Sequence, residues 1–145
     1  MKKFIKISLC FLIVIASVLS FSACEKKPAE PQLKGTAYED ARFQKFEKAL
    51  IEKGIVYKEV IKRDHAMVGA KEAYAYTFDK NFVVEIYAYE KDSEVFKEAA
   101  EVNMIPLLEM GGTIPVKFNG TMCIYFSDWQ NEKTDAIFDI FKNIK

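Results

Sequence analysis

The single histidine of the chain, His65, follows Asp64 in the stretch KRDHAM and is the first place to look for chemistry. A carboxylate next to an imidazole has the residue types for general acid–base catalysis. Neighbours in sequence rarely aim their side chains at each other, however, so a solvated loop histidine is the favoured interpretation. An enzyme with a cleft near Asp64 and His65 stays as an alternative.

The chain has few residues that could bind a metal ion or a cofactor. A zinc site normally takes three or four His, Cys or acidic ligands at suitable spacings, and the folded part of the chain offers one histidine and one cysteine, Cys123. Cys123 lies in the apolar run TMCIYF without a histidine nearby, which predicts a buried structural thiol rather than a nucleophile. The Gly111-Gly112 pair lacks the frame of a phosphate-binding loop. We therefore expect no catalytic residue, no metal and no cofactor.

Aromatic residues supply the most distinctive surface chemistry, at 14% of the chain. Alternation places Tyr74, Tyr76, Tyr87 and Tyr89 on two paired strands. They form either a stripe on an open sheet face, where tyrosine suits binding, or a set of cross-strand pairs that stabilise the sheet. Trp129, in the polar stretch SDWQNEK, is either a lid on the core or an exposed anchor. These five residues are the candidate binding surface.

The N-terminal residues have the layout of a secretory signal. Three lysines lie within the first six residues, and Ile7 to Phe21 is an unbroken run of apolar and small residues, followed by Ser22 and Ala23. This order of charge, apolar run and small residues is typical of a signal peptide. The run of 15 residues is shorter than the roughly 20 that a spanning helix needs. An uncleaved anchor helix is the alternative, and it leaves the remaining chain on the same side of the membrane.

The stretch Phe21-Ser22-Ala23-Cys24 resembles a lipobox, the cleavage and lipidation site of bacterial lipoproteins. Ser22, Ala23 and Cys24 match that motif, and Phe21 stands where leucine is usual. The resemblance implies cleavage before Cys24 and attachment of diacylglycerol to its sulfur. The usage of Lys, Ile, Phe and Asn is similar to that of low-GC Gram-positive proteins. The resemblance covers only the first 24 residues and implies nothing about the domain that follows.

Removing the signal changes the charge balance. The leader carries three of the 21 basic residues and none of the 21 acidic ones, so the mature chain has 18 basic residues against 21 acidic ones. A small negative net charge argues against a nucleic-acid partner, which requires a basic face, and against electrostatic docking onto anionic lipid. The expected attachment to the membrane is the lipid at Cys24, because two acyl chains suffice for stable anchoring.

Residues 24–35 then read as the lipidated cysteine and a flexible tether. Two prolines, several charges and one leucine cannot build a core. The eleven residues after Cys24 reach roughly 34 Å when extended at about 3.1 Å each. The predicted division is therefore a signal peptide over 1–23, the tether over 24–35 and a single domain over 36–145.

Helix signals open the domain. Thr36 and Glu39 have the spacing of a capping box, apolar residues recur at helical spacing up to Leu50, and Gly54 suits a left-handed C-terminal cap. A second helix is predicted from Asp92-Ser93 to about Val102, and a third from near Asn131.

Strand signals lie between these helices. They comprise IVYKEVIK, AYAYTF, FVVEIYAYE, IPLLEM, TIPVKF and TMCIYF, with an Asn119-Gly120 hairpin turn between the last two. The order α-β-β-β-α-β-β-β-α predicts an α+β fold, with an antiparallel sheet of five to six strands and three helices on one face. The other face can stay exposed to solvent.

Together these features predict a membrane-anchored extracytoplasmic lipoprotein that serves as a binding or accessory module of the cell envelope. Its expected partners are the membrane, through Cys24, and an envelope protein, peptide or small ligand, but not nucleic acid. The alternatives are an envelope-acting hydrolase with a cleft near Asp64 and His65, and a structural or inhibitor-type protein.

Overall fold

The computed structural model describes residues 37–79 and 81–145 of the chain. The predicted signal peptide, Cys24, the tether and Thr36 lie outside these residues. Within the described ranges, the α-helices are α2 (Ala41–Glu52), α3 (Glu94–Val102) and α4 (Thr134–Lys142), with one 3-10 turn, η1 (Ala66–Val68). The strands are β1 (Glu59–Lys62), β2 (Glu72–Asp79), β3 (Phe82–Ala88), β4 (Met104–Pro106), β5 (Thr113–Pro115), β6 (Lys117–Asn119) and β7 (Met122–Phe126).

The strands form one antiparallel sheet in the order β1-β2-β3-β7-β6, and β4 pairs with β5 in a separate two-stranded sheet. This confirms the predicted α+β class with antiparallel pairing. The alternating segments form the β2–β3 hairpin, and the turn at Asn119-Gly120 joins β6 to β7, with Gly120 at a φ of 57°. Both hairpins follow from local turn chemistry and period-two patterning.

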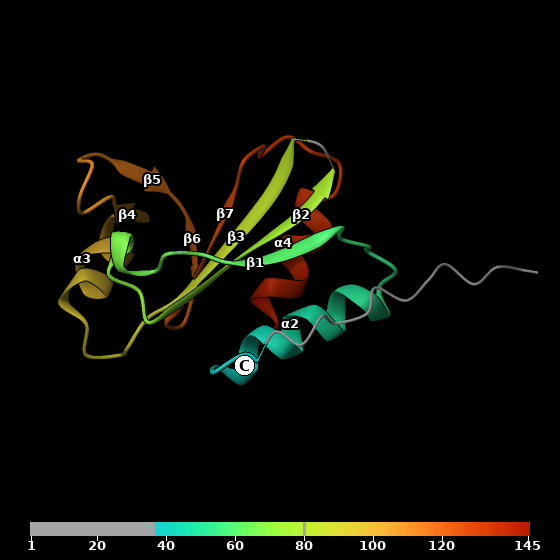
Figure 1. Ribbon diagram of the computed structural model, residues 1–145, viewed down its shortest axis with the longest axis horizontal. Helices are drawn as coiled ribbons and strands as arrows, with labels where there is room; N and C mark the ends of the chain where they lie inside the picture. Colours follow the sequence, from blue (N-terminus) through green and yellow to red (C-terminus); the bar gives the residue numbers. More distant parts are fainter. Residues whose placement is uncertain (1–36, 80) are drawn as a thin grey trace, which may run out of the picture. The chain divides into compact units, whose positions relative to one another are not determined.

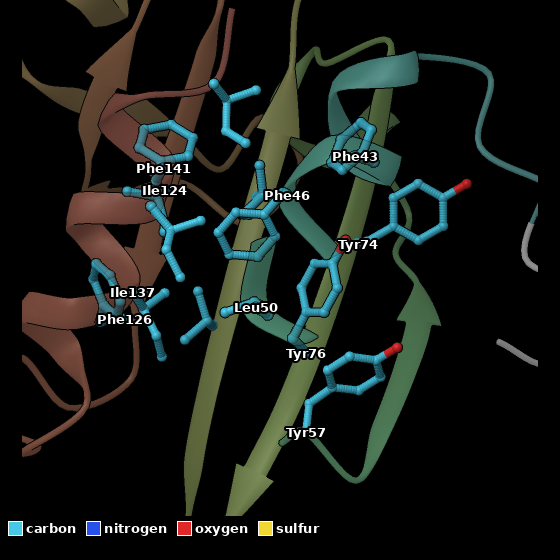
Figure 2. Packing of buried hydrophobic residues seen from close by; sticks show 14 of the residues in the cluster. Phe43, Phe46, Leu50, Tyr57, Tyr74, Tyr76, Ile124, Phe126, Ile137 and Phe141 are labelled. Atoms are coloured by element: carbon cyan, nitrogen blue, oxygen red, sulfur yellow. The ribbon is translucent and has the colours of Figure 1, made fainter. Parts of the chain in front are cut away.

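The first face of the sheet carries the larger core, under α2 and α4 (Figure 1). Phe46 and Leu50 of α2 and Phe141 of α4 are fully buried against it, and each such side chain contributes roughly 1.5–3 kcal/mol by leaving water. Figure 2 shows Tyr74 and Tyr76 of β2 pointing into the same layer. Alternate residues of β2, β3 and β7 thus hold the two helices on one side.

The second face is covered at one end by α3, η1 and the β4–β5 pair, which lie together in Figure 1. Ala99 of α3 and Ile105 of β4 pack there with Tyr87, Tyr89 and Cys123 of the sheet. The prediction that all helices lie on one face is therefore wrong for α3. Helical periodicity shows that a stripe of α3 is buried, but it does not indicate against which face of the sheet.

Helix α2 begins later than the capping-box pattern predicts. Its N-cap is Asp40, whose side chain accepts a hydrogen bond from the backbone N–H of Arg42. The capping-box pattern predicted that the N–H of Glu39 would donate to Thr36. It donates instead to Oε1 of the Glu72 carboxylate at 2.9 Å, on a strand distant in sequence.

The end of α2 matches its prediction. Gly54 has a φ of 68°, and the N–H of Ile55 donates to the carbonyl of Leu50 at 2.9 Å, as in a Schellman cap. In the second half of the chain, the predicted strand TIPVKF is divided into β5 and β6. Pro115 offers no N–H to a ladder, and the N–H of Val116 donates to Asn103, so the chain passes from the small sheet to the large one.

Candidate binding surface

The second face of the sheet is left partly open beyond the end that α3 covers. One row of side chains crosses it in register, with Ile61 opposite Ala75, Ala75 opposite Glu85, and Glu85 opposite Tyr125. Odd-numbered residues of β1, β2, β3 and β7 point to this face because side chains alternate along a strand. We call this surface the open face; its residues are Ile61, Arg63, Thr77, Val83, Glu85 and Tyr125.

Glu85 is the polar centre of the open face. Its side chain is 12% exposed, and its Oε1 lies 2.9 Å from Nη2 of Arg63. The hydroxyl of Tyr87, which is itself buried, donates to Oε2. A carboxylate with so little solvent needs such partners, because an unpaired buried charge is costly. Glu85 is therefore held in one position by an ion pair and a phenol.

Tyr87 joins the open face to the covered end. Burial raises the pKa of its phenol far above the ordinary value, and the hydrogen bond to Glu85 raises that pKa further. The phenol therefore stays protonated and can only donate to Glu85. The buried Tyr87 hydroxyl thus holds one oxygen of the Glu85 carboxylate. Arg63 contacts the other oxygen, and its side chain is 52% exposed to solvent.

Apolar and cationic groups flank Glu85. Ile61 is 44% exposed on β1, and Tyr125 is half-buried on β7. A guanidinium has five N–H donors, so Arg63 can donate to a partner while it contacts Glu85. Tyrosine and arginine are enriched in protein interfaces, and here both share the open face with an exposed aliphatic side chain.

The four predicted tyrosines do not share a surface. Tyr74 and Tyr76 point into the core under α2, and Tyr87 and Tyr89 point to the opposite face under the α3 end. All four are at most 4% exposed. This corrects the predicted tyrosine stripe. In the described register, the strands form no cross-strand tyrosine pairs either, because Tyr74 lies opposite Ile86 and Tyr87 opposite Ala73, and the rings pack in two separate cores instead. Register explains the result, because residues two apart share a face but the two strands contribute their tyrosines to different faces.

Trp129 both covers part of the core and remains partly exposed, so it combines the two roles considered for it. Its ring meets Phe126 edge-on, with centroids 4.9 Å apart, and it is 38% exposed. The indole thus covers the end of the core where β7 leaves the sheet. It lies after the strand end rather than on the open face.

Asp64 and His65 bond to different backbone groups. Asp64 Oδ1 accepts from the N–H of Ala66 at 3.1 Å, and His65 Nδ1 lies 2.9 Å from the carbonyl oxygen of Ala70. Both contacts shape the turn around η1. Among the described residues, the contacts of Asp64 and His65 are with backbone groups and do not join the two side chains into a catalytic pair.

Cys123 is fully buried, as the apolar run TMCIYF predicted. Burial raises the pKa of its thiol, and a contact with Tyr89 only partly offsets this. A protonated, inaccessible thiol is a packing group. In the described part of the chain, no three His, Cys, Asp or Glu residues gather in a way that could hold a metal ion.

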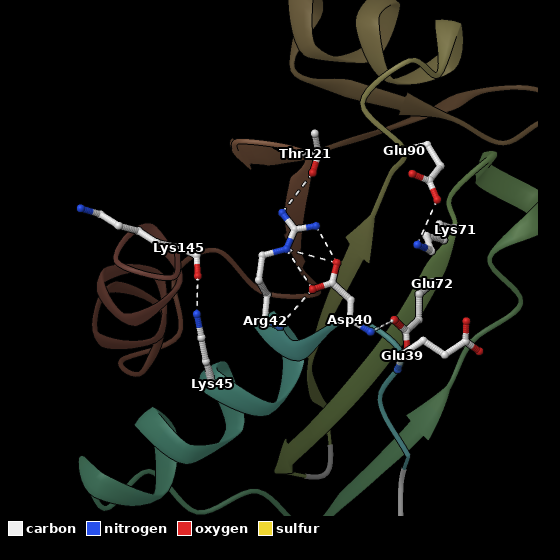
Figure 3. A network of polar contacts seen from close by, with 9 residues as sticks. All are labelled: Glu39, Asp40, Arg42, Lys45, Lys71, Glu72, Glu90, Thr121 and Lys145. Atoms are coloured by element: carbon white, nitrogen blue, oxygen red, sulfur yellow. Dashed lines mark hydrogen bonds and ion pairs between the residues drawn. The ribbon is translucent and has the colours of Figure 1, made fainter.

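Two further buried carboxylates were missed by sequence reasoning. Glu72 accepts hydrogen bonds from the backbone N–H groups of Glu39 and Asp40 and from the hydroxyl of Tyr74 (Figure 3 shows the backbone contact at Asp40). Glu47 is 2% exposed and accepts from the hydroxyl of Tyr57. Glu72 thus ties the segment before α2 to β2.

The open face was also missed, although one signal pointed to it. Glu85 is the only charged residue of β3, between Val84 and Ile86, and such a residue in a central strand needs a partner. Nothing local identifies Arg63 as that partner, because their proximity follows from the register of three strands.

No protein-family model, curated protein or solved structure matches this chain. In the described ranges, no helix combines the length and hydropathy that a bilayer-spanning segment needs.

Proposed function

We propose that this chain is a lipoprotein anchored at the extracytoplasmic face of the cell membrane, where it acts as a binding or accessory module of the cell envelope. The anchor rests on the lipobox-like stretch Phe21 to Cys24 and the basic, apolar leader before it. The tether after Cys24 gives the domain a reach of roughly 34 Å.

The observation that carries the binding role is the fixed ion pair of Glu85 and Arg63 on the open face. Its surroundings, Ile61 and Tyr125, offer apolar contact, and Arg63 offers donors for a carboxylate or carbonyl of a partner. The partner that suits this surface best is a protein or peptide, since aromatic and arginine side chains carry most of the binding energy in such interfaces.

A test of the anchor uses metabolic labelling with palmitate. Wild-type protein is expected to carry the label and to fractionate with membranes. Cys24→Ala is expected to lose the label and to leave either released protein or an unprocessed precursor. Label that survives this substitution would contradict the lipidation site.

A test of the binding role compares two exposed aliphatic residues. Ile61 (44% exposed) lies on the open face and Val56 (57% exposed) lies outside it. After crosslinking in cells, Ile61→Lys is expected to reduce capture of the partner about tenfold or more, as loss of an interface residue worth at least about 1.4 kcal/mol would. Val56→Lys is expected to leave capture unchanged. Equal losses from both variants would contradict an open-face interface.

A further inference from the structure

A groove of about 700 Å³ lies between α2 and α4, on the outer side of the helical layer. Ala49, Ile140 and Ile144 line it with apolar atoms. Ile140 and Ile144 also belong to the core beneath, so the bottom of the groove is fixed by packing. The groove therefore offers an apolar floor at the surface of the domain.

Lysines surround this floor. Lys45, Lys53 and Lys145 line the groove, and the lining acid is Asp139. Asp139 lies 2.7 Å from Nζ of Lys142, and this contact lowers the pKa of its carboxyl. Asp139 is thus paired with Lys142, and Lys53 also acts on its carboxyl. The mature chain is slightly acidic overall, yet the lining of this groove has three lysines against one acidic side chain.

Two of these lysines meet directly at the groove. Lys45 Nζ donates to the main-chain oxygen of Lys145 at 2.8 Å, while the side chain of Lys145 extends away from that contact (Figure 3). The contact holds the ammonium of Lys45 at the rim. A group that enters the groove meets the ammonium groups of Lys53 and Lys145 beside apolar atoms, while Lys45 keeps a main-chain oxygen as its partner. This combination suits an anionic headgroup with its first carbons.

The groove lies on the side of the sheet opposite the open face. Helices α2 and α4 cover the first face, whereas Glu85 and Arg63 belong to the second. The N-cap of α2 is Asp40, close in sequence to the first described residue. A domain that rested on its helical layer would present the open face away from the membrane.

We propose that this groove docks the domain onto anionic phospholipid headgroups of the membrane that anchors it. The inference rests on the proposed function, because the lipid at Cys24 supplies the proximity. The attraction of one lysine to an anionic bilayer strengthens binding about fivefold and is screened within a Debye length. Docking therefore orients an already anchored domain, and salt weakens it.

The experiment uses the mature lipidated protein in vesicles of phosphatidylcholine, with and without phosphatidylglycerol. A fluorophore is attached at Asn143→Cys, which lines the groove, or at Glu98→Cys, which is exposed on α3. The remaining thiol, Cys123, is buried, so labelling is selective. Quenchers in the lipid headgroup region report which side approaches the bilayer.

With phosphatidylglycerol present, we expect stronger quenching at Asn143→Cys than at Glu98→Cys, and loss of this difference at high salt. Lys45→Glu together with Lys53→Glu is expected to abolish the difference. Lys91→Glu together with Lys97→Glu, an equal charge change at exposed positions beyond the groove, is expected to preserve it. Equal quenching of the two labels, or quenching indifferent to the groove lysines, would overturn the docking inference.

The same vesicles separate this inference from the anchor. A lipidated protein floats with vesicles of either composition, because acyl chains need no headgroup charge. Failure to float with phosphatidylcholine alone would overturn the anchor, and the docking inference with it. Flotation with both compositions without a difference between the labels would overturn the docking inference alone.

Discussion

Oε1 of Glu85 lies 2.9 Å from Nη2 of Arg63, although the Glu85 side chain is 12% exposed and the Arg63 side chain 52%. The carboxylate is held inside the sheet surface, and the guanidinium reaches it from solvent. Strand register creates this relationship, since Glu85 and Ala75 are paired and Ala75 is paired with Ile61, two residues before Arg63. The pair gives the open face a largely buried carboxylate with a half-exposed guanidinium as its partner.

The two members of this pair should contribute unequally to stability. Glu85→Ala removes the acceptor of the buried Tyr87 hydroxyl and should lower the free energy of unfolding by about 1–3 kcal/mol. Arg63→Ala breaks a half-exposed ion pair and should cost about 0–1 kcal/mol. Urea unfolding of both variants measures the difference. An Arg63→Ala loss as large as that of Glu85→Ala would contradict the assigned roles.

Glu72 should be more important to the fold than its charge alone suggests. Its carboxylate accepts backbone N–H groups at 2.9 and 2.8 Å and the Tyr74 hydroxyl at 2.8 Å. Glu72→Ala leaves these donors without their acceptor and should cost about 3 kcal/mol. Glu90→Ala is the control, because Glu90 is exposed and paired only with Lys71 at the surface, and it should cost less than about 1 kcal/mol. Thermal and urea unfolding should rank the two variants in this order.

Alkaline pH should destabilise the domain. Burial raises the pKa of Tyr76 and of Tyr87 well above 10.0. Each phenol is then neutral in the folded state while it ionises in the unfolded state, so stability is complete below about pH 10 and falls as pH rises further. Each such tyrosine should add a loss of up to about 1.4 kcal/mol per pH unit. Tyr87→Phe should make the free energy of unfolding fall less steeply with pH, by the contribution of one tyrosine. An unchanged dependence on pH would show that Tyr87 ionises freely in the folded protein.

The thiol of Cys123 should react only when the domain opens. It is fully buried, and burial raises its pKa, so neither access nor thiolate is available in the folded state. Alkylation of Cys123 should therefore follow the rate of unfolding and accelerate with urea. Rapid stoichiometric alkylation without denaturant would contradict a packed thiol.

Local sequence patterns correctly predicted the hairpins and helix caps that depend on residues close together in the sequence. The β2–β3 and β6–β7 hairpins, the C-terminal cap at Gly54 and the N-cap of α3 at Ser93 all depend on residues within a few positions of each other. The start of α2 was misplaced because Glu72 competes from a distant strand for the N–H of Glu39.

The candidate surface was harder to predict because it depends on register and on the choice of face. Alternation placed Tyr87 and Tyr89 on one of two paired strands, but it could not show that α3 covers them. It also could not show that Glu85 lies beyond that cover, or that Arg63 approaches it. Each of these facts follows from the pairing of strands remote in sequence.

The most direct test of a binding module with an outward open face is photocrosslinking in living cells from two single positions. A photoreactive amino acid replaces either Tyr125, on the open face, or Gln44, exposed on α2 on the opposite side of the sheet. We predict a defined protein adduct from Tyr125 that Ile61→Lys diminishes, and no such adduct from Gln44. The same protein adduct from Gln44, or none from Tyr125, would contradict the account.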